Sequence, residues 1–475
     1  MKKNVLLSKE ETERQLSYIS DIRKISGERG KKVFVQTFGC QQNEADSERL
    51  LGMAEKMGYV KTSVPEEASL ILINTCAVRE HAELKALSIA GGYKHCKEKN
   101  PELIIGICGC MVSQEHRKSD IKNKYPYIDF LLGTTLIHRF PEILYKTLTE
   151  KKRNFLIDND AVIIAEGLPV SRDVSAGSAY VSIMYGCNNF CTYCIVPYVR
   201  GRERSREPEA VLDEIRELLK KGVKEITLLG QNVNSYRPLS REDYGFKELL
   251  KDICSLEGEA LIHFMTSHPK DASRELIDVM ADNPPQKGKI GISGRFHLPL
   301  QSGSDRVLKA MNRHYDTARY KELVLYMRER IPDIAITTDI IVGFPGESEE
   351  EFNETLEMLR EIRYDNIYSF IYSKRTGTPA AVMENQILDD VKGARFQRMI
   401  ALQTEISKEK NLEFKGKTVR ALVEGVSKTD GSKLTARTSS NRLVHFEGDP
   451  TLTGEYVSVF IEKAEPHALY GRLVK

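Results

Sequence analysis

Short apolar segments alternate with helical segments along most of this 475-residue chain, and this alternation limits the folds open to it. The apolar segments include KKVFVQTF (31–38), SLILINT (69–75) and ELIIGIC (102–108). Segments with helical spacing lie between them, at 43–58 and at 78–98. Buried strands joined by helices form parallel sheets that are covered on both faces. We therefore expect an α/β chain.

The length of the chain predicts more than one domain. Strand–helix alternation resumes near residue 180 and gives at least six further strands up to 372, which is typical of a whole or partial (β/α) barrel with its chemistry at the carboxyl ends of the strands. A long charged helix at 388–413 follows, and then short alternating strands that predict a small antiparallel barrel. The expected division is an N-terminal extension (1–30), an N-terminal parallel α/β domain (31–147), a linker (148–172), the central barrel (173–411) and the terminal barrel (412–475).

Composition excludes several classes of protein. The 70 basic residues nearly balance the 68 acidic residues, so nucleic-acid binding would need local patches. No run of 18 apolar residues predicts a membrane helix, and the N-terminus is a poor signal peptide. We expect a cytoplasmic chain, in which the nine cysteines stay reduced. All nine lie within the first 254 residues. This distribution indicates a function located in that part of the chain rather than a disulfide framework.

Cys187, Cys191 and Cys194 follow the predicted strand YVSIM (180–184). Thiolates select zinc or iron–sulfur clusters, and a structural zinc site needs four ligands rather than three. Three thiolates on a four-iron cluster leave one iron open to a small molecule. This Cys-x3-Cys-x2-Cys spacing, with Tyr193 before the last cysteine, resembles the radical S-adenosylmethionine (SAM) superfamily. The resemblance implies that SAM binds the open iron and is cleaved by one electron to methionine and a 5′-deoxyadenosyl radical.

Cys40, Cys76 and Cys110 each end a predicted strand, and in a parallel sheet such ends lie side by side. Their spacing fits no zinc pattern, and buried structural cysteines would fit equally well. The surrounding CQQNEADSE, NTCAVRE and GCM, however, resemble the N-terminal domain of methylthiotransferases. The resemblance implies that these three cysteines hold an auxiliary 4Fe-4S cluster used in supplying sulfur. Cys108 would point the same way as Cys110, but the GCM context favours Cys110. The cysteines expected to be structural are Cys96, Cys108 and Cys254.

Three further segments with polar groups lie at predicted strand ends: GQNVNSY (230–236), HLPLQSGS (297–304) and TDIIVGFPGE (338–347). Each alone could be a simple turn. All three resemble segments of radical-SAM methylthiotransferases. The resemblance implies cofactor-binding contacts to SAM by Tyr193, by Gln231 or Asn232, by Gln301 or Ser302, and by Asp339.

Basic residues gather in two places. RGRERSR (200–206) has four arginines against one glutamate and could be a solvated face or a contact for substrate phosphates. Residues 412–475 resemble the small RNA-binding TRAM domain that ends these enzymes. RNA-binding barrels use basic grooves and exposed aromatic residues. The basic residues here are Lys415, Lys417, Arg420, Lys433, Arg437 and Arg442.

The family has three substrate branches. They act on N(6)-dimethylallyladenosine beside the tRNA anticodon, on threonylcarbamoyladenosine at the same position, or on an aspartate of a small-subunit ribosomal protein. The resemblance favours the first branch, because Gln41-Gln42-Asn43 follows Cys40 where the third branch has Pro-Lys. The segment before Gly377 departs slightly from the usual spelling of the first branch.

The resemblance also implies a reaction and its partners. One SAM methylates a sulfur associated with the auxiliary cluster, and a second yields the radical that removes hydrogen from carbon 2 of the adenine. The methylthio group is then transferred to that carbon. The target base has to leave its stack, which suits an unpaired anticodon loop. The expected partners are a tRNA anticodon stem-loop and an electron donor of flavodoxin or ferredoxin type, with no membrane and a monomeric chain.

Overall fold

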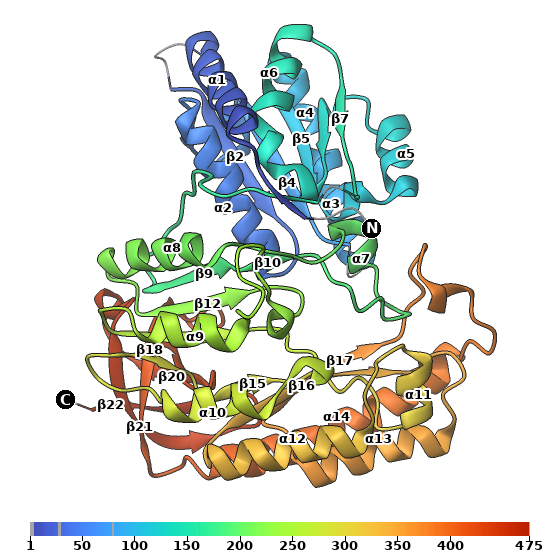
Figure 1. Cartoon of the computed structure of the whole chain (residues 1–475), viewed down its shortest axis with the longest axis vertical. Coiled ribbons are helices and arrows are strands. Elements are labelled where there is room, and N and C mark those ends of the chain that lie inside the picture. Colours follow the sequence, from blue (N-terminus) through green and yellow to red (C-terminus); the bar gives the residue numbers. More distant parts are fainter. Residues whose placement is uncertain (1–3, 27–29, 78–79, 161, 475) are drawn as a thin grey trace.

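A computed structural model describes residues 4–26, 30–77, 80–160 and 162–474. Figure 1 shows an N-terminal α/β part in blue, a central part running from green to orange, and a C-terminal barrel in red beside the central part. Within the described residues no helix is both long enough and apolar enough to cross a membrane.

The N-terminal part is a three-layer sandwich, as the alternation predicts. Its six parallel strands run in the order β3-β2-β4-β5-β6-β7, and β4 and β5 are buried throughout because helices cover both faces. The strands are β2 (Lys32–Thr37), β3 (Val60–Lys61), β4 (Leu70–Thr75), β5 (Ile104–Gly109), β6 (Phe130–Leu132) and β7 (Asn154–Leu156). One face carries α1 (Lys9–Ser26), α2 (Gln41–Lys56) and α6 (Phe140–Glu150), and the other carries α3 (Glu80–Gly92), α4 (Lys94–Lys99) and α5 (Glu115–Lys124).

The N-terminal extension is part of this sandwich. Helix α1 packs on α6, with Ile22 buried in the core and Gln15 Nε2 donating a hydrogen bond to Glu142 (3.4 Å). Strand β1 (Val5–Leu6) pairs with β8 (Ile163–Ile164). The helix expected at 78–98 is two helices, α3 and α4, with Tyr93 between them; residues 78–79 lie outside the described residues.

The predicted linker, 148–172, contains structure that its polar composition concealed. Residues 154–156 form β7, which pairs with β6 at the edge of the six-stranded sheet, and residues 163–164 form β8. Both strands have only two or three residues, too few for an alternating pattern to be recognised.

The central part is an open barrel of parallel strands, which confirms the partial (β/α) barrel. Strands β9 (Ser178–Ser182), β12 (Glu225–Leu229), β13 (Ala260–Phe264) and β14 (Ile290–Ile292) pair in the order β14-β13-β12-β9. Strands β15 (Arg295–His297), β16 (Ala335–Val342) and β17 (Asn366–Ile371) form a second sheet, and one hydrophobic core spans both. The packed helices are α8 (Pro208–Lys220), α9 (Phe246–Cys254), α10 (Arg274–Asp282), α12 (Thr317–Arg330), α13 (Glu349–Ile362) and α14 (Asp389–Leu412).

The C-terminal part is a closed five-stranded barrel in the described residues, ordered β18-β19-β20-β22-β21. Its strands are β18 (Thr418–Val426), β19 (Leu434–Thr438), β20 (Leu443–Glu447), β21 (Tyr456–Ala464) and β22 (Leu469–Leu473). The expectation of a purely antiparallel barrel is wrong at one seam, because β20 pairs in parallel with β22, a strand not anticipated from the sequence. Tyr456 donates a hydrogen bond to Glu225 (3.0 Å), so this barrel contacts the amino end of β12.

Candidate functional site

Cys40, Cys76 and Cys110 lie just beyond the ends of three neighbouring strands. The last residue of β2 pairs with the fifth residue of β4, and the last residues of β4 and β5 pair with each other, so the three strands end at one level. The chain reverses its order across the sheet between β2 and β4, and such reversals form ligand crevices at carboxyl ends. Burial raises the pKa of the Cys110 thiol to about 12. The positive charge of Arg200 lowers this pKa, and the nearby Cys76 and Cys40 raise it.

A network of amides fixes this arrangement. Cys40 is the N-cap residue of α2, and Asn43 in the first turn donates a hydrogen bond to the side chain of Asn74 (3.2 Å). Asn74 in turn donates to the carbonyl oxygen of Asn43 (2.8 Å), which ties α2 to the end of β4. A Cβ atom at Gly39 would lie 2.8 Å from the Cβ of Cys76, so the turn before Cys40 rests directly on Cys76.

Cys108 and Cys110 point into different surroundings. Cys108 belongs to the core on the α2 face of the sheet, together with Leu72 and Phe130. Gly109 has a φ of 102°, and this turn redirects the chain so that Cys110 emerges beyond the strand. The expectation that both thiols point the same way is therefore wrong, because it assumed that the strand continues to Cys110.

Cys187, Cys191 and Cys194 lie on the loop between β10 (Met184–Tyr185) and α7 (Val196–Arg200). Asn312 holds this loop, because its Nδ2 atom donates to two successive loop carbonyl oxygens at 3.0 and 3.1 Å. Phe190, within the loop, has a φ of 46°. Burial raises the pKa of the Cys187 thiol to about 12, and the neighbouring Cys191 thiol adds to the rise.

Arg313 is a residue of this site that sequence reasoning missed. Its guanidinium is buried and donates to Cys191 Sγ (3.3 Å) and to the hydroxyl oxygen of Tyr193 (3.5 Å). It also donates to the carbonyl oxygen of Pro299 (2.9 Å) and to the hydroxyl oxygen of Tyr315 (3.1 Å). One side chain thus connects the cysteine loop to the end of β15. Nothing in MNRHY (311–315) distinguishes this arginine from a surface residue.

The two cysteine trios share one boundary. Ile195, which directly follows Cys194, lies in a buried cluster with Cys110, Ala77 and Val199. Ala77 directly follows Cys76, so each trio contributes residues to the same apolar contact. Two sets of thiols that are 77 residues apart at their nearest members, Cys110 and Cys187, therefore border a single site.

The donor sets fit clusters better than single ions. In the described residues neither trio brings its three sulfur atoms within 4.8 Å of one another, as a single tetrahedral ion requires. A four-iron cluster, whose thiolates bind different irons, holds them farther apart. Three thiolates at the ends of buried loops are the soft ligand set that such a cluster prefers.

The proposed SAM contacts do not all face open space. The side chain of Asn232 is fully buried, donates to Asp271 (2.6 Å) and accepts from the backbone of His268 (3.0 Å), so both of its ends are used within the protein. Ser302 is also fully buried and accepts from the backbone of Ser304 (3.3 Å). Both side chains therefore make hydrogen bonds that stabilise their own loops.

The other proposed SAM contacts come from different segments. Gln231 follows β12, Tyr193 lies in the cysteine loop and Asp339 lies within β16; all three are partly buried. Gln301 is buried, has a φ of 74° and pairs through its backbone with β16, donating its N–H to the carbonyl oxygen of Asp339 (2.8 Å). His297 Nε2 lies 3.5 Å from the Asp339 carboxylate. The segment after β15 therefore brings Gln301 beside Asp339.

Only one of the four arginines in RGRERSR, Arg202, is exposed, so the segment is not an open phosphate-binding patch as a whole. Arg200, Arg204 and Arg206 are each no more than 5% exposed. Arg200 pairs with the buried Asp46 (3.0 Å), and Arg206 pairs with Glu214 (2.6 Å). A run of arginines has the same sequence pattern whether it faces water or lies in an interface. The sequence alone therefore could not distinguish an exposed patch from a buried one.

Most of the basic residues expected on the C-terminal barrel are paired with acids. Arg442 contacts Asp365 at the start of the β16–β17 sheet rather than an open groove. The other three pairs are Arg420 with Glu259 (3.2 Å), Arg437 with Glu424 (2.6 Å) and Lys433 with Asp430 (2.8 Å). Lys415 and Lys417 are exposed, and neither makes an ion pair with a carboxylate in the described part of the chain.

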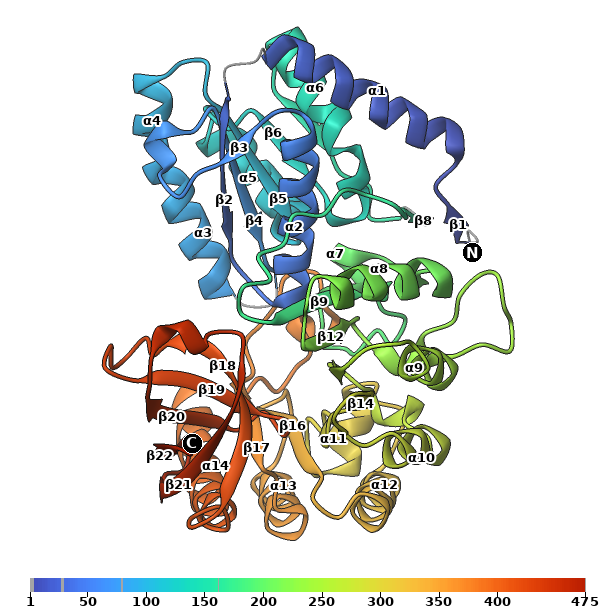
Figure 2. The same cartoon turned by 90° about the vertical axis from the view of Figure 1, so that its left-hand side faces the viewer.

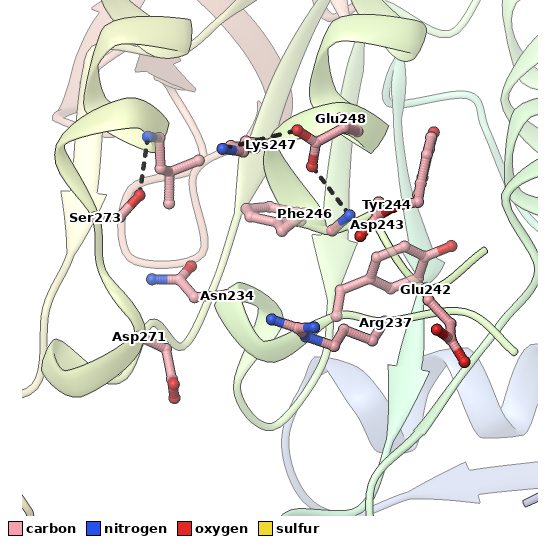
Figure 3. Close-up of a pocket in the computed structure, with 13 residues that line it drawn as sticks. Asn234, Arg237, Glu242, Asp243, Tyr244, Phe246, Lys247, Glu248, Asp271 and Ser273 are labelled. Carbon is pink, nitrogen blue, oxygen red and sulfur yellow. Dashed lines mark hydrogen bonds and ion pairs between the residues drawn. The ribbon is translucent and has the colours of Figure 1, made fainter.

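A polar pocket of about 360 Å³ lies beside α9 and the loop that follows β12 (Figure 3). Carboxylates dominate its charged lining and would repel phosphate, so it does not suit RNA. The charged side chains that line it are Glu242, Asp243, Glu248, Asp271, Arg237 and Lys247. None of the described residues that line it is a cysteine, so it lies outside the thiol site.

Comparison with protein families divides the chain into three matches. Residues 32–133 match Uncharacterized protein family UPF0004, residues 181–359 match the Radical SAM superfamily, and residues 413–474 match the TRAM domain. The first match contains Cys40, Cys76 and Cys110, and the second contains the Cys187 loop.

Curated relatives match almost the full length. The tRNA-2-methylthio-N(6)-dimethylallyladenosine synthase of Thermoanaerobacter sp. (strain X514) is 48% identical over 100% of this chain and 99% of its own length. The enzyme of the same name from Clostridium perfringens (strain SM101 / Type A) is 50% identical over 94% of this chain and 98% of its own. The first match includes residues 1–30, which the motif resemblance did not cover. Among solved structures, a radical S-adenosylmethionine methyltransferase from Kitasatospora setae shares the fold, with a TM-score of 0.54, 13% identity, and coverage of 74% of this chain and 75% of that one.

Proposed function

The chain belongs to the family of tRNA-2-methylthio-N(6)-dimethylallyladenosine synthases, and from this we propose that it adds a methylthio group to carbon 2 of N(6)-dimethylallyladenosine beside the anticodon of tRNA. It is a radical-SAM methylthiotransferase, an enzyme that transfers a sulfur group. The alignment with the first of these relatives is 48% identical overall and covers the N-terminal sandwich, the radical-SAM part and the TRAM barrel.

The contact between the two cysteine trios carries this proposal. A reaction that makes a carbon radical at one centre and supplies sulfur from another needs both centres beside one substrate atom. Ile195 and Cys110 share a buried cluster, so the two thiol sets border the same space. Radical formation alone would not require the second set.

We assign Cys187, Cys191 and Cys194 to the 4Fe-4S cluster that binds SAM, and the N-terminal trio Cys40, Cys76 and Cys110 to the auxiliary 4Fe-4S cluster. The cofactors are SAM and these two clusters, which when bound supply hydrogen abstraction and the sulfur for transfer. The protein holds the thiols, and the apolar contact formed by Ile195 and Val199 keeps water from between them.

SAM contacts are assigned, within each pair of alternatives, to the side chain that is less used within the protein. Gln231 is preferred to Asn232, because both polar ends of Asn232 are already used. Gln301 is preferred to Ser302, because the Ser302 hydroxyl already accepts a hydrogen bond from the backbone of Ser304. Tyr193 and Asp339 complete the set, and Arg313 positions Tyr193 and Cys191 through its two hydrogen bonds.

Each unit of the chain has a share in the reaction. We assign the auxiliary cluster to residues 31–147, SAM binding to residues 173–411 and RNA binding to residues 412–475; the three family matches lie within these ranges. The substrate is the anticodon stem-loop of a tRNA, which places the work in the cytoplasm. A flavodoxin or ferredoxin supplies the electron to a monomeric enzyme.

Nucleoside mass spectrometry tests this proposal. Cluster-reconstituted protein reacts anaerobically with SAM, a reductant and a mixture of tRNAs that carry either N(6)-dimethylallyladenosine or threonylcarbamoyladenosine. We expect one methylthio group on the dimethylallyl nucleoside alone, and no product with the matched Cys187→Ala variant. Modification of the threonylcarbamoyl nucleoside would overturn the substrate assignment. Release of 5′-deoxyadenosine without a modified nucleoside would point to a protein substrate.

A further inference from the structure

A second group of metal-binding side chains lies in the N-terminal sandwich, away from the cysteine trios. Glu66 belongs to the short helix η1 (Pro65–Glu67), which precedes β4, and His95 and Cys96 belong to α4, which precedes β5. All three lie at the amino ends of these strands. The cluster cysteines lie at the carboxyl ends, so the six residues of β4 separate the two places by about 20 Å. Figure 2 shows α4 at the outer end of the N-terminal part, away from the central barrel.

The three side chains converge on one point. In the described residues, theirs is the one group of three His, Cys, Asp or Glu ligand atoms that all lie within 4.8 Å of one another. His95 Nε2 is 3.4 Å from Cys96 Sγ and 3.7 Å from Glu66 Oε1. In a tetrahedral zinc site with a Zn–S distance of about 2.3 Å and Zn–N and Zn–O distances of about 2.0 Å, neighbouring ligand atoms lie about 3.3–3.6 Å apart. The observed separations are close to these.

The orientation of the histidine ring suits metal binding. Its Nδ1 contacts the carbonyl oxygen of Gly92, which can only accept, so Nδ1 serves as the donor. Nε2 then faces Cys96 and Glu66 and is the ring atom that would bind a metal ion. A hydrogen bond from the other ring nitrogen to a carbonyl oxygen is the usual support of a metal-bound histidine.

We propose that Glu66, His95 and Cys96 bind one Zn²⁺ ion, with water as the fourth ligand. One sulfur, one nitrogen and one oxygen in tetrahedral positions suit zinc, whereas calcium and magnesium require oxygen ligands. Zinc also binds such a site more tightly than Fe²⁺ does. The site is independent of the methylthio transfer proposed above and uses none of its cysteines.

The ion would join η1 to α4. Cys96 is buried in the core on the α3–α4 face, whereas Glu66 and His95 are about half exposed. Their exposure leaves the fourth position open to water, and the burial of Cys96 anchors the site to the sandwich. Without metal the same residues amount to an exposed His95–Glu66 contact beside a core cysteine, and such exposed contacts contribute little to stability. Bound zinc stabilises only the folded chain, because the three ligands come together only there.

Zinc titration of the cluster-loaded enzyme tests the proposal. Loading with iron–sulfur clusters first occupies the six other thiols that could bind zinc. Competition with a chromophoric zinc chelator should then give one zinc per chain. Cys96→Ser should weaken this binding by about 100-fold, and Glu66→Gln by at least about tenfold.

Two matched variants serve as controls. Glu67→Gln changes the neighbouring carboxylate, which pairs with Lys32 instead, and Cys254→Ser changes another partly buried thiol. Both should bind zinc as the wild type does. X-ray absorption at the zinc edge should show one sulfur at about 2.3 Å and lighter ligands at about 2.0 Å.

The outcomes are separable from those of the nucleoside assay. Zinc binding that persists in both Cys96→Ser and Glu66→Gln, or that is absent from the cluster-loaded wild type, would overturn the proposed site. Iron content and circular dichroism, measured without zinc, should be the same for all variants, which excludes misfolding as the cause of lost binding. Failure of methylthio transfer would leave this result unaffected.

Discussion

Cys108 and Cys110 are only two residues apart but lie in different surroundings. Cys108 is held in the core near Leu72 and Phe130, whereas Cys110 lies beyond the turn at Gly109 with Cys40 and Cys76. We expect Cys110→Ala to lose the auxiliary cluster, so that iron falls from about eight to about four atoms per chain. SAM cleavage should persist and the methylthio product should disappear. Iron analysis, 5′-deoxyadenosine release and nucleoside analysis measure these three results.

Cys108→Ala is the matched control for that experiment. It removes a thiol two residues away, but from the apolar core, so iron content and product formation should be retained with some loss of stability. If instead Cys108→Ala loses the cluster and Cys110→Ala keeps it, the ligand assignment is reversed.

Arg313 acts through the groups that it holds. Its guanidinium donates to Cys191 Sγ and to Tyr193, and hydrogen bonds to cluster sulfurs help to set the reduction potential. Arg313→Gln removes a positive charge and a donor beside the thiolate, so the potential of the radical-SAM cluster should fall. SAM cleavage should slow by about 10- to 100-fold. A redox titration followed by electron paramagnetic resonance measures the potential.

Arg319→Gln provides the comparison, because Arg319 is a partly exposed arginine of α12 that pairs with Glu322 on its own helix. It should leave both the potential and the rate unchanged. A potential in Arg313→Gln equal to that of the wild type would limit Arg313 to a structural role.

At the scale of elements, strand ends were more predictable than interfaces. The ends of β2, β4 and β5 were visible as apolar runs followed by cysteine, so the N-terminal trio could be proposed from the sequence. The turn at Gly109 was not visible, because a single residue in a left-handed conformation has no periodic signal. The choice between Gln231 and Asn232 was open for a related reason: their motif marks a strand end but does not say which side chain folds back on the loop.

The buried arginines join elements that are distant in the sequence. Arg172, in the predicted linker, pairs with Glu48 of α2 (2.6 Å) and with Glu214 of α8 (2.6 Å), and Glu214 also pairs with Arg206 (2.6 Å). Burial alone would raise the pKa of Glu214, but the charges of Arg206 and Arg172 lower it to about 2. The carboxylate therefore helps to hold the sandwich against the barrel.

We expect Glu214→Gln to lower the free energy of unfolding by about 3 kcal/mol, because it leaves Arg206 and Arg172 buried with an incomplete partner. The folded pKa of Glu214 is depressed, so its contribution is complete above its unfolded pKa of 4.5 and is lost as the pH falls toward 2. The difference between wild type and variant should thus stay constant from pH 8 to about 5 and shrink below that. Urea unfolding followed by circular dichroism at several pH values measures it.

Glu217→Gln is the matched control on the same helix. Glu217 is exposed and pairs only with Lys220 among the described residues, so its loss should have little effect at any of these pH values. Equal destabilisation by both variants would show that helix α8, rather than the buried network, accounts for the change.

Across the whole molecule, the C-terminal barrel and the thiol site lie toward opposite ends of the central strands. Tyr456 and Arg442 attach the C-terminal barrel to Glu225 and Asp365, which lie at the amino ends of β12 and β17. The loop that carries Cys187, Cys191 and Cys194 follows β9 and β10, beyond the carboxyl end of β9. An RNA that contacts both must therefore span the depth of the central part, which suits a stem-loop better than a single flipped nucleotide.

Of the six basic residues expected to bind RNA, Lys415 and Lys417 are the two that are not paired with acids within the part of the chain that the structure describes, and they are our candidates for phosphate contacts. The double change Lys415→Glu and Lys417→Glu should weaken tRNA binding and reduce the slope of log affinity against log salt by about 2. Lys433→Glu, on the same barrel but already paired with Asp430, is the matched control and should change neither much. Filter binding at several salt concentrations measures both quantities. If the double variant keeps the salt slope of the wild type, Lys415 and Lys417 do not contact phosphates. RNA affinity would then have to come from another face of the molecule.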